Sequence, residues 1–218
     1  QFAPLLGGKS LLHLTLERLS GLSRDITCIA SEDHRFLVKE TVESAGVTGR
    51  QILEPVARNT AAAMACAALL AEPGDLLLFA PADHHIPDAA LFAQTVREGV
   101  PAALAGQIVT FGVAPSFPST AYGYIEAGTE SADGRSRAVV RFVEKPTASV
   151  AETLILHGGY FWNAGIFLVR AGTLLAALRA HAPDILRACE RAAAAVSVDG
   201  SFLRLEPEAF SACRADSI

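Results

Sequence analysis

The sequence has little cysteine, and its cysteines form no motif. Four occur in 218 residues, at Cys28, Cys66, Cys189 and Cys213. No two are close enough in sequence for the paired spacing of a zinc site or a dithiol redox motif, and their neighbours are apolar or helix-forming. We therefore expect reduced, mostly buried thiols, as in a cytoplasmic protein.

The sequence also lacks a stripe of positive charge and a long apolar run. The formal net charge is −5, and the Lys and Arg residues are scattered, which argues against a nucleic-acid polymer as partner. Every apolar run is shorter than a membrane span, so no membrane partner is expected. The chain begins at Gln1 without Met and without a signal-peptide pattern, as if entered part-way. The oligomeric state stays open, and a homo-oligomer is one option.

Apolar residues are abundant, at 51% against 19% charged residues, and suit a globular α/β chain forming a single domain over residues 1–218. Strand-like and helical segments alternate along the first half. The strand-like segments are 26–30, 51–53, 76–80 and 108–113, and the helical ones are 10–19, 32–44, 61–70 and 89–104. This alternation predicts a Rossmann-like, doubly wound, mainly parallel sheet flanked by helices.

Two further features complete the expected fold. Residues 122–126 and 137–144 are strand-like, with a turn at Asp133–Gly134 between them, and predict a small antiparallel excursion beside the main sheet. Residues 172–213 are expected to be largely helical, with breaks at Pro183 and Gly200. Ser10 is placed to cap the first helix, and Asn59 or Thr60 to cap the helix at 61–70.

Asp83 is the first candidate for chemistry. It follows Leu76–Ala80, an apolar run without polar alternation, which predicts a strand covered on both faces. Ligands of open α/β sheets bind at the carboxyl ends of strands, where Pro81 places Asp83. A carboxylate there can hold Mg²⁺, which is usually shared with substrate phosphates. The alternative is that Asp83 caps the next segment or closes a turn.

A second polar cluster follows the strand at 51–53. The connection Glu54-Pro-Val-Ala-Arg-Asn-Thr60 brings a carboxylate, a guanidinium and an amide to that strand's carboxyl end. Such groups can read a purine edge and steady phosphates. A turn and a helix cap would explain Pro55, Asn59 and Thr60, but not Glu54 and Arg58 beside them.

Two later segments offer ligands for a sugar phosphate. Pro146 ends the strand 137–144 and leaves Glu144 and Lys145 at its end, where Glu could bind sugar hydroxyls and Lys a phosphate. Adjacent strand residues point to opposite faces unless the proline turn bends the chain, so a simple ion pair between these two is a poor explanation. Ordinary surface charge is the alternative. In Trp162-Asn-Ala-Gly165, Trp162 is expected in the core, and Asn163 is the better ligand because a buried amide needs partners.

Five motifs together carry a resemblance: Glu54-Pro-Val-Ala-Arg-Asn-Thr-Ala61, Pro81-Ala-Asp-His-His-Ile86, Tyr122-Gly-Tyr-Ile125, Phe142-Val-Glu-Lys-Pro146 and Trp162-Asn-Ala-Gly-Ile-Phe167. In this order the chain resembles the bacterial mannose-1-phosphate guanylyltransferases, within the nucleotide-sugar pyrophosphorylase family. The resemblance implies a nucleotidyltransferase that moves GMP from GTP to mannose 1-phosphate, with Mg²⁺ as cofactor.

The resemblance also implies roles for single residues. Glu54, Arg58, Asn59 and Thr60 would serve the guanine nucleotide, and Asp83 would hold Mg²⁺ near the α-phosphate. Gly123, Glu144 and Asn163 would line the mannose. Lys145 would hold the sugar's phosphate, so that Asp83 and Lys145 carry the chemistry.

The chain departs from the family pattern at both ends. Of a Pro-Lys-Gln-Phe segment that follows the family's glycine-rich phosphate loop only Gln1-Phe2 is present, and the acid that follows a Ser-Ile pair in the family lies beyond Ser217-Ile218. We therefore expect a catalytic domain incomplete at its phosphate loop and its metal-binding acid. The alternatives are a non-catalytic sugar-phosphate or nucleotide-binding module, a pyrophosphorylase for another sugar 1-phosphate, and, more weakly, a glycosyltransferase, whose Asp-x-Asp motif is absent because position 85 is His.

Overall fold

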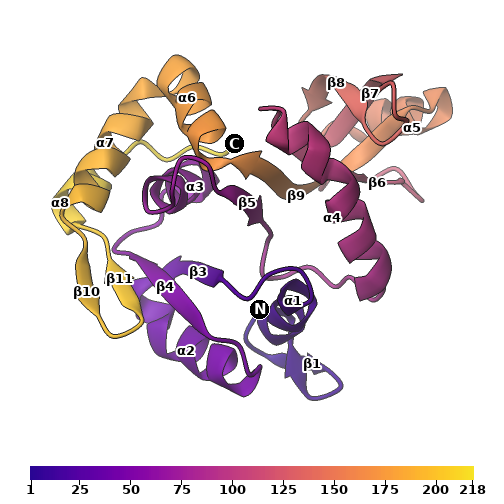
Figure 1. The fold of residues 1–218 in the computed structure, drawn as a ribbon. Helices are drawn as coiled ribbons and strands as arrows, with labels where there is room; N and C mark the ends of the chain where they lie inside the picture. Colours follow the sequence, from indigo (N-terminus) through magenta and orange to yellow (C-terminus); the bar gives the residue numbers. More distant parts are fainter. The chain divides into compact units, whose positions relative to one another are not determined.

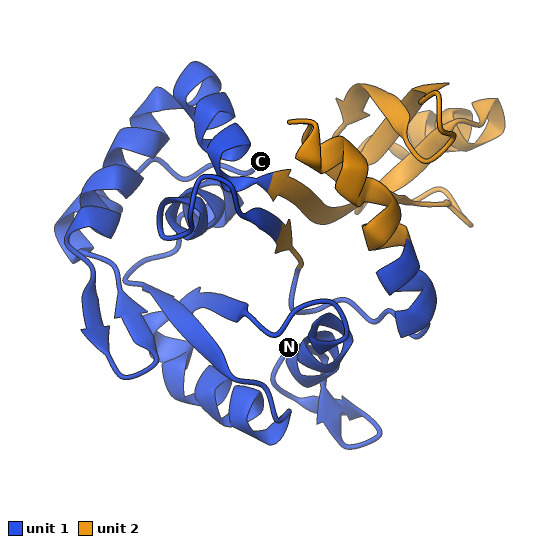
Figure 2. Cartoon of the chain, in the orientation of Figure 1, with its two compact units in different colours: residues 1–77, 81–94, 170–218 blue, residues 78–80, 95–169 orange.

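The computed structural model describes residues 1–218, which form two compact units (Figures 1 and 2). Unit 1 consists of residues 1–77, 81–94 and 170–218, and unit 2 of residues 78–80 and 95–169. The strand β5 (Leu76–Phe79) and the helix α4 (Ala89–Leu104) each run from unit 1 into unit 2. A single domain over the whole chain stays a prediction.

Unit 1 contains a four-stranded sheet in the order β10-β11-β4-β3. Its strands are β3 (Ile26–Ser31), β4 (Gly49–Glu54), β10 (Ser197–Asp199) and β11 (Phe202–Arg204). Both neighbours of β4 run parallel to it, and only β10 is antiparallel to its partner. Parallel pairing between strands that alternate with helices confirms the expected α/β class. Because Ser31 pairs with Glu54, both lie at the carboxyl edge of this sheet.

Most of residues 172–213 are helical, as expected, and the hairpin of β10 and β11 is the exception. Gly200 lies in its turn with φ of 61°, a left-handed conformation that glycine adopts without strain. Phe202 and Leu203 are buried, and β11 extends the sheet from β4. Asp199 pairs with Phe202, so Gly200 and Ser201 form the two-residue loop, and Gly200 marks a turn between strands.

Short helices surround this sheet. They are α1 (Leu11–Ser20), the 3₁₀ turn η1 (Glu32–His34), α2 (Arg35–Ser44), α3 (Asn59–Leu69), α6 (Ala171–His181), α7 (Pro183–Ala194) and α8 (Pro207–Ser211). The Ser10 hydroxyl accepts a hydrogen bond of 3.1 Å from the His13 N–H, which confirms the predicted cap of α1. A two-stranded hairpin of β1 (Pro4–Leu6) and β2 (Lys9–Ser10) precedes α1.

Two groups of packed helices give unit 1 its core. Leu12 and Leu16 of α1 pack with Val38 and Val42 of α2 and with Ile26 of β3. On α3 the small residues are buried, and this helix packs against α6 and α7. The small side chains of α3 allow these helices to approach one another closely. Three of the four free cysteines are buried, and Cys28 is half-buried, as expected.

Unit 2 is built on a mostly antiparallel sheet. It contains β6 (Val109–Val113), β7 (Tyr124–Glu130), β8 (Arg137–Val143), β9 (Tyr160–Arg170) and the helix α5 (Ala148–His157). The order is β5-β9-β7-β8, and β6 also pairs with β9. Strands β7 and β8 form the predicted antiparallel excursion, here part of a five-stranded sheet. Strand β9 begins at Tyr160 and includes Asn163.

The sheet order also places β5 at an edge, which corrects one expectation. All four residues of β5 are half-buried rather than buried, so the strand is not fully covered on both faces. The apolar run without polar alternation therefore predicted more burial than the residues of β5 have.

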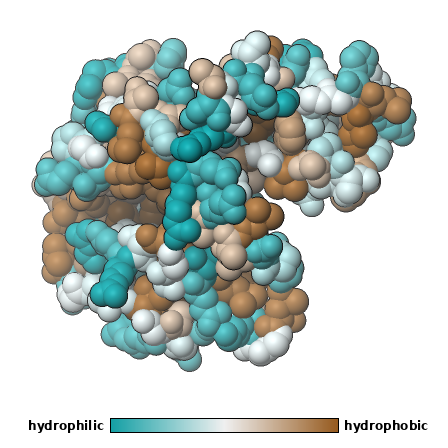
Figure 3. Space-filling view, turned by 45° about the vertical axis from the view of Figure 1, so that its right-hand side comes forward, coloured by the Kyte–Doolittle hydropathy of each residue, from teal (hydrophilic) through white to brown (hydrophobic).

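The surface mixes hydrophilic and hydrophobic residues, and Figure 3 shows both kinds on one face. Exposed large hydrophobic side chains include Phe36 of α2 and Leu156 of α5. On α2 the Phe36 side chain is exposed, and Val38 and Val42 provide the buried contacts. Among the helices, none combines the length and the apolar character needed to cross a membrane.

Candidate functional site

Glu54 is the last residue of β4, directly before the loop that leads to the next helix, and its carboxyl group has a perturbed pKa. The side chain is half-buried, and burial raises the pKa of Glu54 to about 7 because water no longer solvates the charged form. Its Oε1 atom is buried without a hydrogen-bond partner. A buried carboxyl group that is partly protonated near neutral pH can either donate or accept a hydrogen bond, and Glu54 is therefore suited to a polar ligand.

Arg58 of the same loop is held by backbone oxygens. Its Nη2 donates a hydrogen bond of 2.6 Å to the carbonyl oxygen of Ser211, and its Nη1 one of 3.1 Å to that of Ala57. The Nε atom is buried and has no partner. Because carbonyl oxygens carry no net charge, these bonds orient the guanidinium without neutralising it. It remains able to attract an anion.

Asn59 and Thr60 do not cap α3, contrary to expectation. The helix begins at Asn59 itself, and its N-cap residue is Arg58, without a side-chain capping bond. Asn59 has φ of 61°, a left-handed conformation that asparagine tolerates better than most residues. The Thr60 hydroxyl instead accepts a hydrogen bond of 3.1 Å from the N–H of Ile218.

The N-terminal N–H groups of α3 are served by a distant segment. The Ala61 N–H donates to the carbonyl oxygen of Asp216 at 3.1 Å, and the Asp216 N–H donates to that of Arg58 at 3.3 Å. A helix N-terminus needs partners for N–H groups that the helix itself leaves unused. Asp216 provides one through its backbone, which removes the need for a local cap.

Asp83 lies in a turn after β5, with its side chain largely exposed. The preceding Ala82 packs on the core formed by α1, α2 and β3, so the turn is anchored to unit 1. The carboxylate lies 4.0 Å from the His84 Nε2. Asp83 does not cap α4, because the Leu91 N–H donates to the Asp88 carboxylate at 2.8 Å. The turn assignment holds, and it leaves the carboxylate free to bind a ligand.

The acids and imidazoles of this chain form no cluster of three or more that could hold a metal ion by itself. Mg²⁺, however, is usually bound by one or two carboxylates, several waters and substrate phosphates rather than by an all-protein cage. A single exposed carboxylate at a strand end, as at Asp83, fits that mode. The donor set does not suit zinc, whose sites in proteins use several protein ligands.

In unit 2 the structure brings Gly123, Glu144 and Asn163 together. The Asn163 N–H donates a hydrogen bond of 2.8 Å to the carbonyl oxygen of Gly123. A Cβ atom on Gly123 would lie 2.7 Å from Oε2 of Glu144 and 3.8 Å from Cβ of Asn163. Residues that are 40 positions apart in the printed sequence therefore form one small polar cluster.

The Asn163 side chain already has partners within unit 2. Its Oδ1 accepts hydrogen bonds from the Gly165 N–H at 3.0 Å and from the Thr110 hydroxyl at 3.4 Å. The expectation that this amide needs partners is met by the protein itself. A ligand at this position would therefore meet the side-chain nitrogen, which is a donor.

Lys145 pairs with its neighbour Glu144, because the chain bends at the proline turn and strand alternation no longer applies. Strand β8 ends at Val143, and the chain bends through Lys145, whose φ is 37°. After this bend the Lys145 Nζ lies 3.5 Å from Oε1 of Glu144. Both side chains are exposed, so the pair is weak and can open for a ligand.

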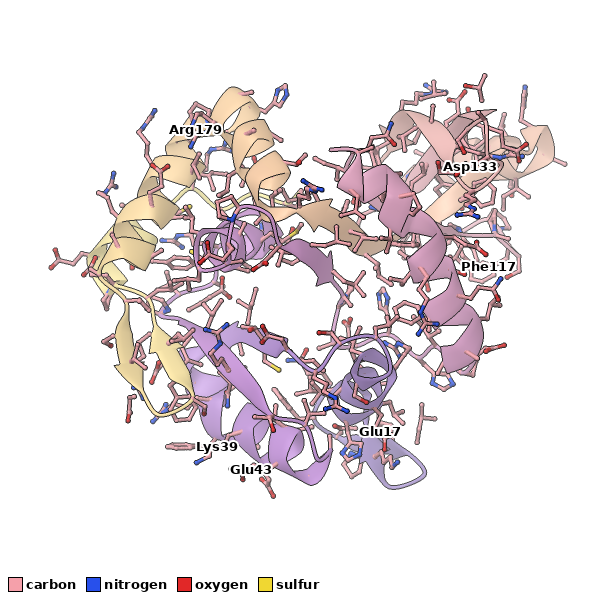
Figure 4. All side chains as sticks on the ribbon, viewed as in Figure 1. Glu17, Lys39, Glu43, Phe117, Asp133 and Arg179 are labelled. Atoms are coloured by element: carbon pink, nitrogen blue, oxygen red, sulfur yellow. The ribbon has the colours of Figure 1, made fainter.

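Trp162 is half-buried at the edge of the core of unit 2, so its predicted core position is met only in part. It lies against the buried cluster of Tyr124 with α5, and its ring contacts Phe117 and Tyr122 edge to face, with centroid distances of 4.9 and 5.1 Å. The indole Nε1 is buried and has no partner. The Phe117 side chain is labelled in Figure 4.

Sequence reasoning missed the segment that supports the loop after β4. Ser211, Arg214 and Asp216 contact this loop or one another, and Arg214 also reaches Asp184. Apart from the contact between Arg214 and Asp216, these partners lie 30 to 158 residues apart, and no local pattern joins them. Only the packing of α7 and α8 brings them together.

A family model described as nucleotidyl transferase matches residues 1–206. The chain is 43% identical over 228 residues to a mannose-1-phosphate guanylyltransferase of Escherichia coli K12 and 42% identical over 228 residues to ManC, a mannose-1-phosphate guanylyltransferase of Salmonella typhimurium LT2. All of this chain and 48% of each relative are covered, so the chain spans about half their length. A solved structure described as mannose-6-phosphate isomerase from Helicobacter pylori has a TM-score of 0.91 and 32% identity, with 100% of this chain and 85% of that one covered.

Proposed function

This chain belongs to the nucleotidyl transferase family, and we propose that the intact protein transfers GMP from GTP to mannose 1-phosphate, forming GDP-mannose and releasing pyrophosphate. The observation that carries the proposal is the match along the whole chain to relatives named mannose-1-phosphate guanylyltransferase. We place the reaction in the cytoplasm, in keeping with the free thiols.

Unit 1 supplies the nucleotide side in this proposal. The uncompensated guanidinium of Arg58 attracts the phosphates, and the exposed Asn59 and Thr60 at the start of α3 add polar groups beside it. The unpaired Glu54 Oε1 is suited to the hydrogen-bonding edge of guanine. Oriented charged and polar groups of this kind bind a polyanion while fixing its position.

Unit 2 supplies the sugar side. Glu144 accepts hydrogen bonds from mannose hydroxyl groups, and Asn163 donates one. Because Gly123 has no side chain, it leaves room for the side chains of Glu144 and Asn163. Lys145 exchanges its weak contact with Glu144 for the doubly charged phosphate of the sugar, which is the stronger partner. The positive φ at Lys145 turns the chain away from the β8 ladder and places the Lys145 side chain beside Glu144.

The chemistry is an in-line substitution at the α-phosphorus of GTP. An oxygen of the sugar's phosphate forms the new P–O bond, the bond between the α-phosphorus and the oxygen bridging to the β-phosphorus breaks, and pyrophosphate leaves with that electron pair. No covalent protein intermediate is needed. The protein's task is to hold two polyanions that would otherwise repel each other, with Arg58 and Lys145 reducing their repulsion.

Members of this family generally use a divalent metal ion. We propose Mg²⁺, held by Asp83 together with phosphate oxygens and water. Bound there, it would neutralise charge on the reacting phosphates.

A substrate panel tests the proposal. Pyrophosphate release is measured for the intact protein with GTP or ATP, each combined with mannose 1-phosphate or glucose 1-phosphate. We expect the fastest release with GTP and mannose 1-phosphate. Faster release with another pair would assign a different pyrophosphorylase activity, and binding of GTP without release in any pair would indicate a non-catalytic binding module.

A further inference from the structure

Residues 211–218, which we name the closing segment, hold the loop after β4 at four points. Backbone atoms of Ser211 and Asp216 bind Arg58, the Asp216 carbonyl accepts from Ala61, and the Ile218 N–H donates to Thr60. The distances range from 2.6 to 3.3 Å. In each of the four bonds the closing segment contributes a backbone atom. The bonds therefore depend on where the backbone of the segment lies and not on its side chains.

Cys213 of the closing segment is buried, and the Arg214 side chain ties the residues that follow it to α7. The Arg214 Nε donates a hydrogen bond of 2.9 Å to Oδ2 of Asp184, and its Nη1 donates to Oδ2 of Asp216. Asp184 lies in the first turn of α7. The other oxygen of Asp216 accepts from the Ser217 N–H at 3.0 Å. One guanidinium thus ties the closing segment to a helix that packs against α3.

We propose that Arg214 is a positioning residue for nucleotide binding, acting through the closing segment on Arg58 and Thr60. This role rests on the proposed function. Because the bridge joins α7 to Asp216, it holds the Asp216 backbone where the Ala61 N–H and the Arg58 carbonyl meet it. Without the bridge residues 214–218 lose their tie to α7, and the Arg58 carbonyl loses a fixed partner in the Asp216 N–H.

Arg214 is not needed to hold the fold. Its side chain is half exposed, and α7 packs on α3 through buried residues such as Cys189, whose thiol contacts the Ala62 carbonyl at 3.7 Å. Exposed ion pairs contribute little to global stability. Removal of Arg214 is therefore expected to release the closing segment while leaving both helices folded.

The charge state of the bridge supports this role at neutral pH. Hydrogen bonds from Arg214 lower the pKa of Asp184 and the pKa of Asp216 below their ordinary values. Both carboxylates are therefore charged throughout the neutral range, and the bridge is present whenever nucleotide would bind.

The test compares Arg214→Ala, Arg214→Lys and a matched control in the intact protein. Arg179→Ala removes another exposed arginine that pairs with α7, at 3.8 Å from Glu190, and its site on α6 is seen in Figure 4. Affinities for GTP and mannose 1-phosphate are measured by calorimetry, and amide exchange is measured at Ala61 and Ile218 without ligand. All variants should keep the wild-type melting temperature.

We expect Arg214→Ala to weaken GTP binding about fivefold, the effect of a coupling of about 1 kcal/mol, and to speed exchange at both amides. Mannose 1-phosphate binding should not change, Arg214→Lys should recover part of the loss, and Arg179→Ala should resemble wild type. Unchanged GTP affinity and unchanged exchange in Arg214→Ala would overturn the inference. Wild-type protein that fails to bind GTP would refute the proposed function, whereas faster exchange would still show that Arg214 anchors the segment.

Discussion

The carboxylate of Glu144 occupies the space beside Gly123 that a side chain would fill, with its Oε2 atom 2.7 Å from the position of a Cβ on Gly123. The contact involves the far end of a flexible side chain and not the backbone. A larger residue at position 123 can therefore be accommodated only if Glu144 moves. This makes the pair a sensitive test of the sugar side.

Gly123→Ala is expected to displace the Glu144 carboxylate and weaken mannose 1-phosphate binding about tenfold, the loss of one good hydrogen bond to a charged group. Stability should change by less than about 0.5 kcal/mol, since the displaced side chain is exposed. Calorimetry and thermal unfolding separate the two effects. Gly74→Ala, where a Cβ meets nothing within 4 Å, is the control. Unchanged sugar-phosphate affinity in Gly123→Ala would remove Glu144 from the site.

Lys145→Ala is expected to weaken mannose 1-phosphate binding about tenfold or more and leave GTP binding intact, because its proposed partner is the sugar's phosphate. The lost contact with Glu144 is exposed and contributes little to stability. Lys39→Ala, which removes another exposed lysine (Figure 4), is the control for charge. A loss confined to GTP would place Lys145 on the other substrate.

Glu54 makes stability depend on pH in a defined direction. Burial raises the pKa of its carboxyl group to about 7 in the folded state, above the ordinary value of 4.5. The folded state therefore binds the proton more tightly than the unfolded state does, and stability falls as pH rises from about 4.5 to about 7, then stays lower. A shift of this size corresponds to roughly 3 kcal/mol.

Glu54→Gln removes that dependence, because the amide does not titrate. Urea unfolding of wild type and variant is measured at about pH 5 and about pH 8. The variant should gain stability relative to wild type by roughly 2 kcal/mol between these values. A constant difference between the two proteins would mean that Glu54 titrates normally.

The sequence predicted those features that local patterns determine. Ser10 and the apolar spacing of α1 defined that helix, and the strand-helix alternation indicated the α/β class. The polar cluster of Gly123, Glu144 and Asn163 was predicted through the family resemblance, and the structure brings these residues together.

Features that depend on distant partners could not be predicted in this way. Asn59 and Thr60 have the side chains of helix caps, yet Asp216 serves the start of α3 because tertiary packing brings it there. The pairing of Lys145 with Glu144 depends on a backbone bend that strand alternation does not anticipate. The β10–β11 hairpin, by contrast, had a local signal in its two-residue loop, Gly200–Ser201.

Asp83→Asn is expected to keep the fold and lose about two orders of magnitude or more in turnover, because the amide keeps the shape but not the charge that holds Mg²⁺. Asp83 is exposed in a turn, so the change should not affect stability. Turnover is measured over a range of Mg²⁺ concentrations. Asp88→Asn changes a nearby acid that binds only the Leu91 N–H and serves as control. Near-normal turnover with unchanged Mg²⁺ dependence would exclude Asp83 as the metal ligand.

The most direct test of the proposed function follows the α-phosphate of GTP. The intact protein is incubated with GTP labelled at the α-phosphorus, mannose 1-phosphate and Mg²⁺, and the products are separated by chromatography. We predict that the label moves into GDP-mannose in an amount equal to the pyrophosphate released, and that Asp83→Asn nearly abolishes the transfer. Label that stays in GTP, or that appears in GMP without GDP-mannose, would contradict the account.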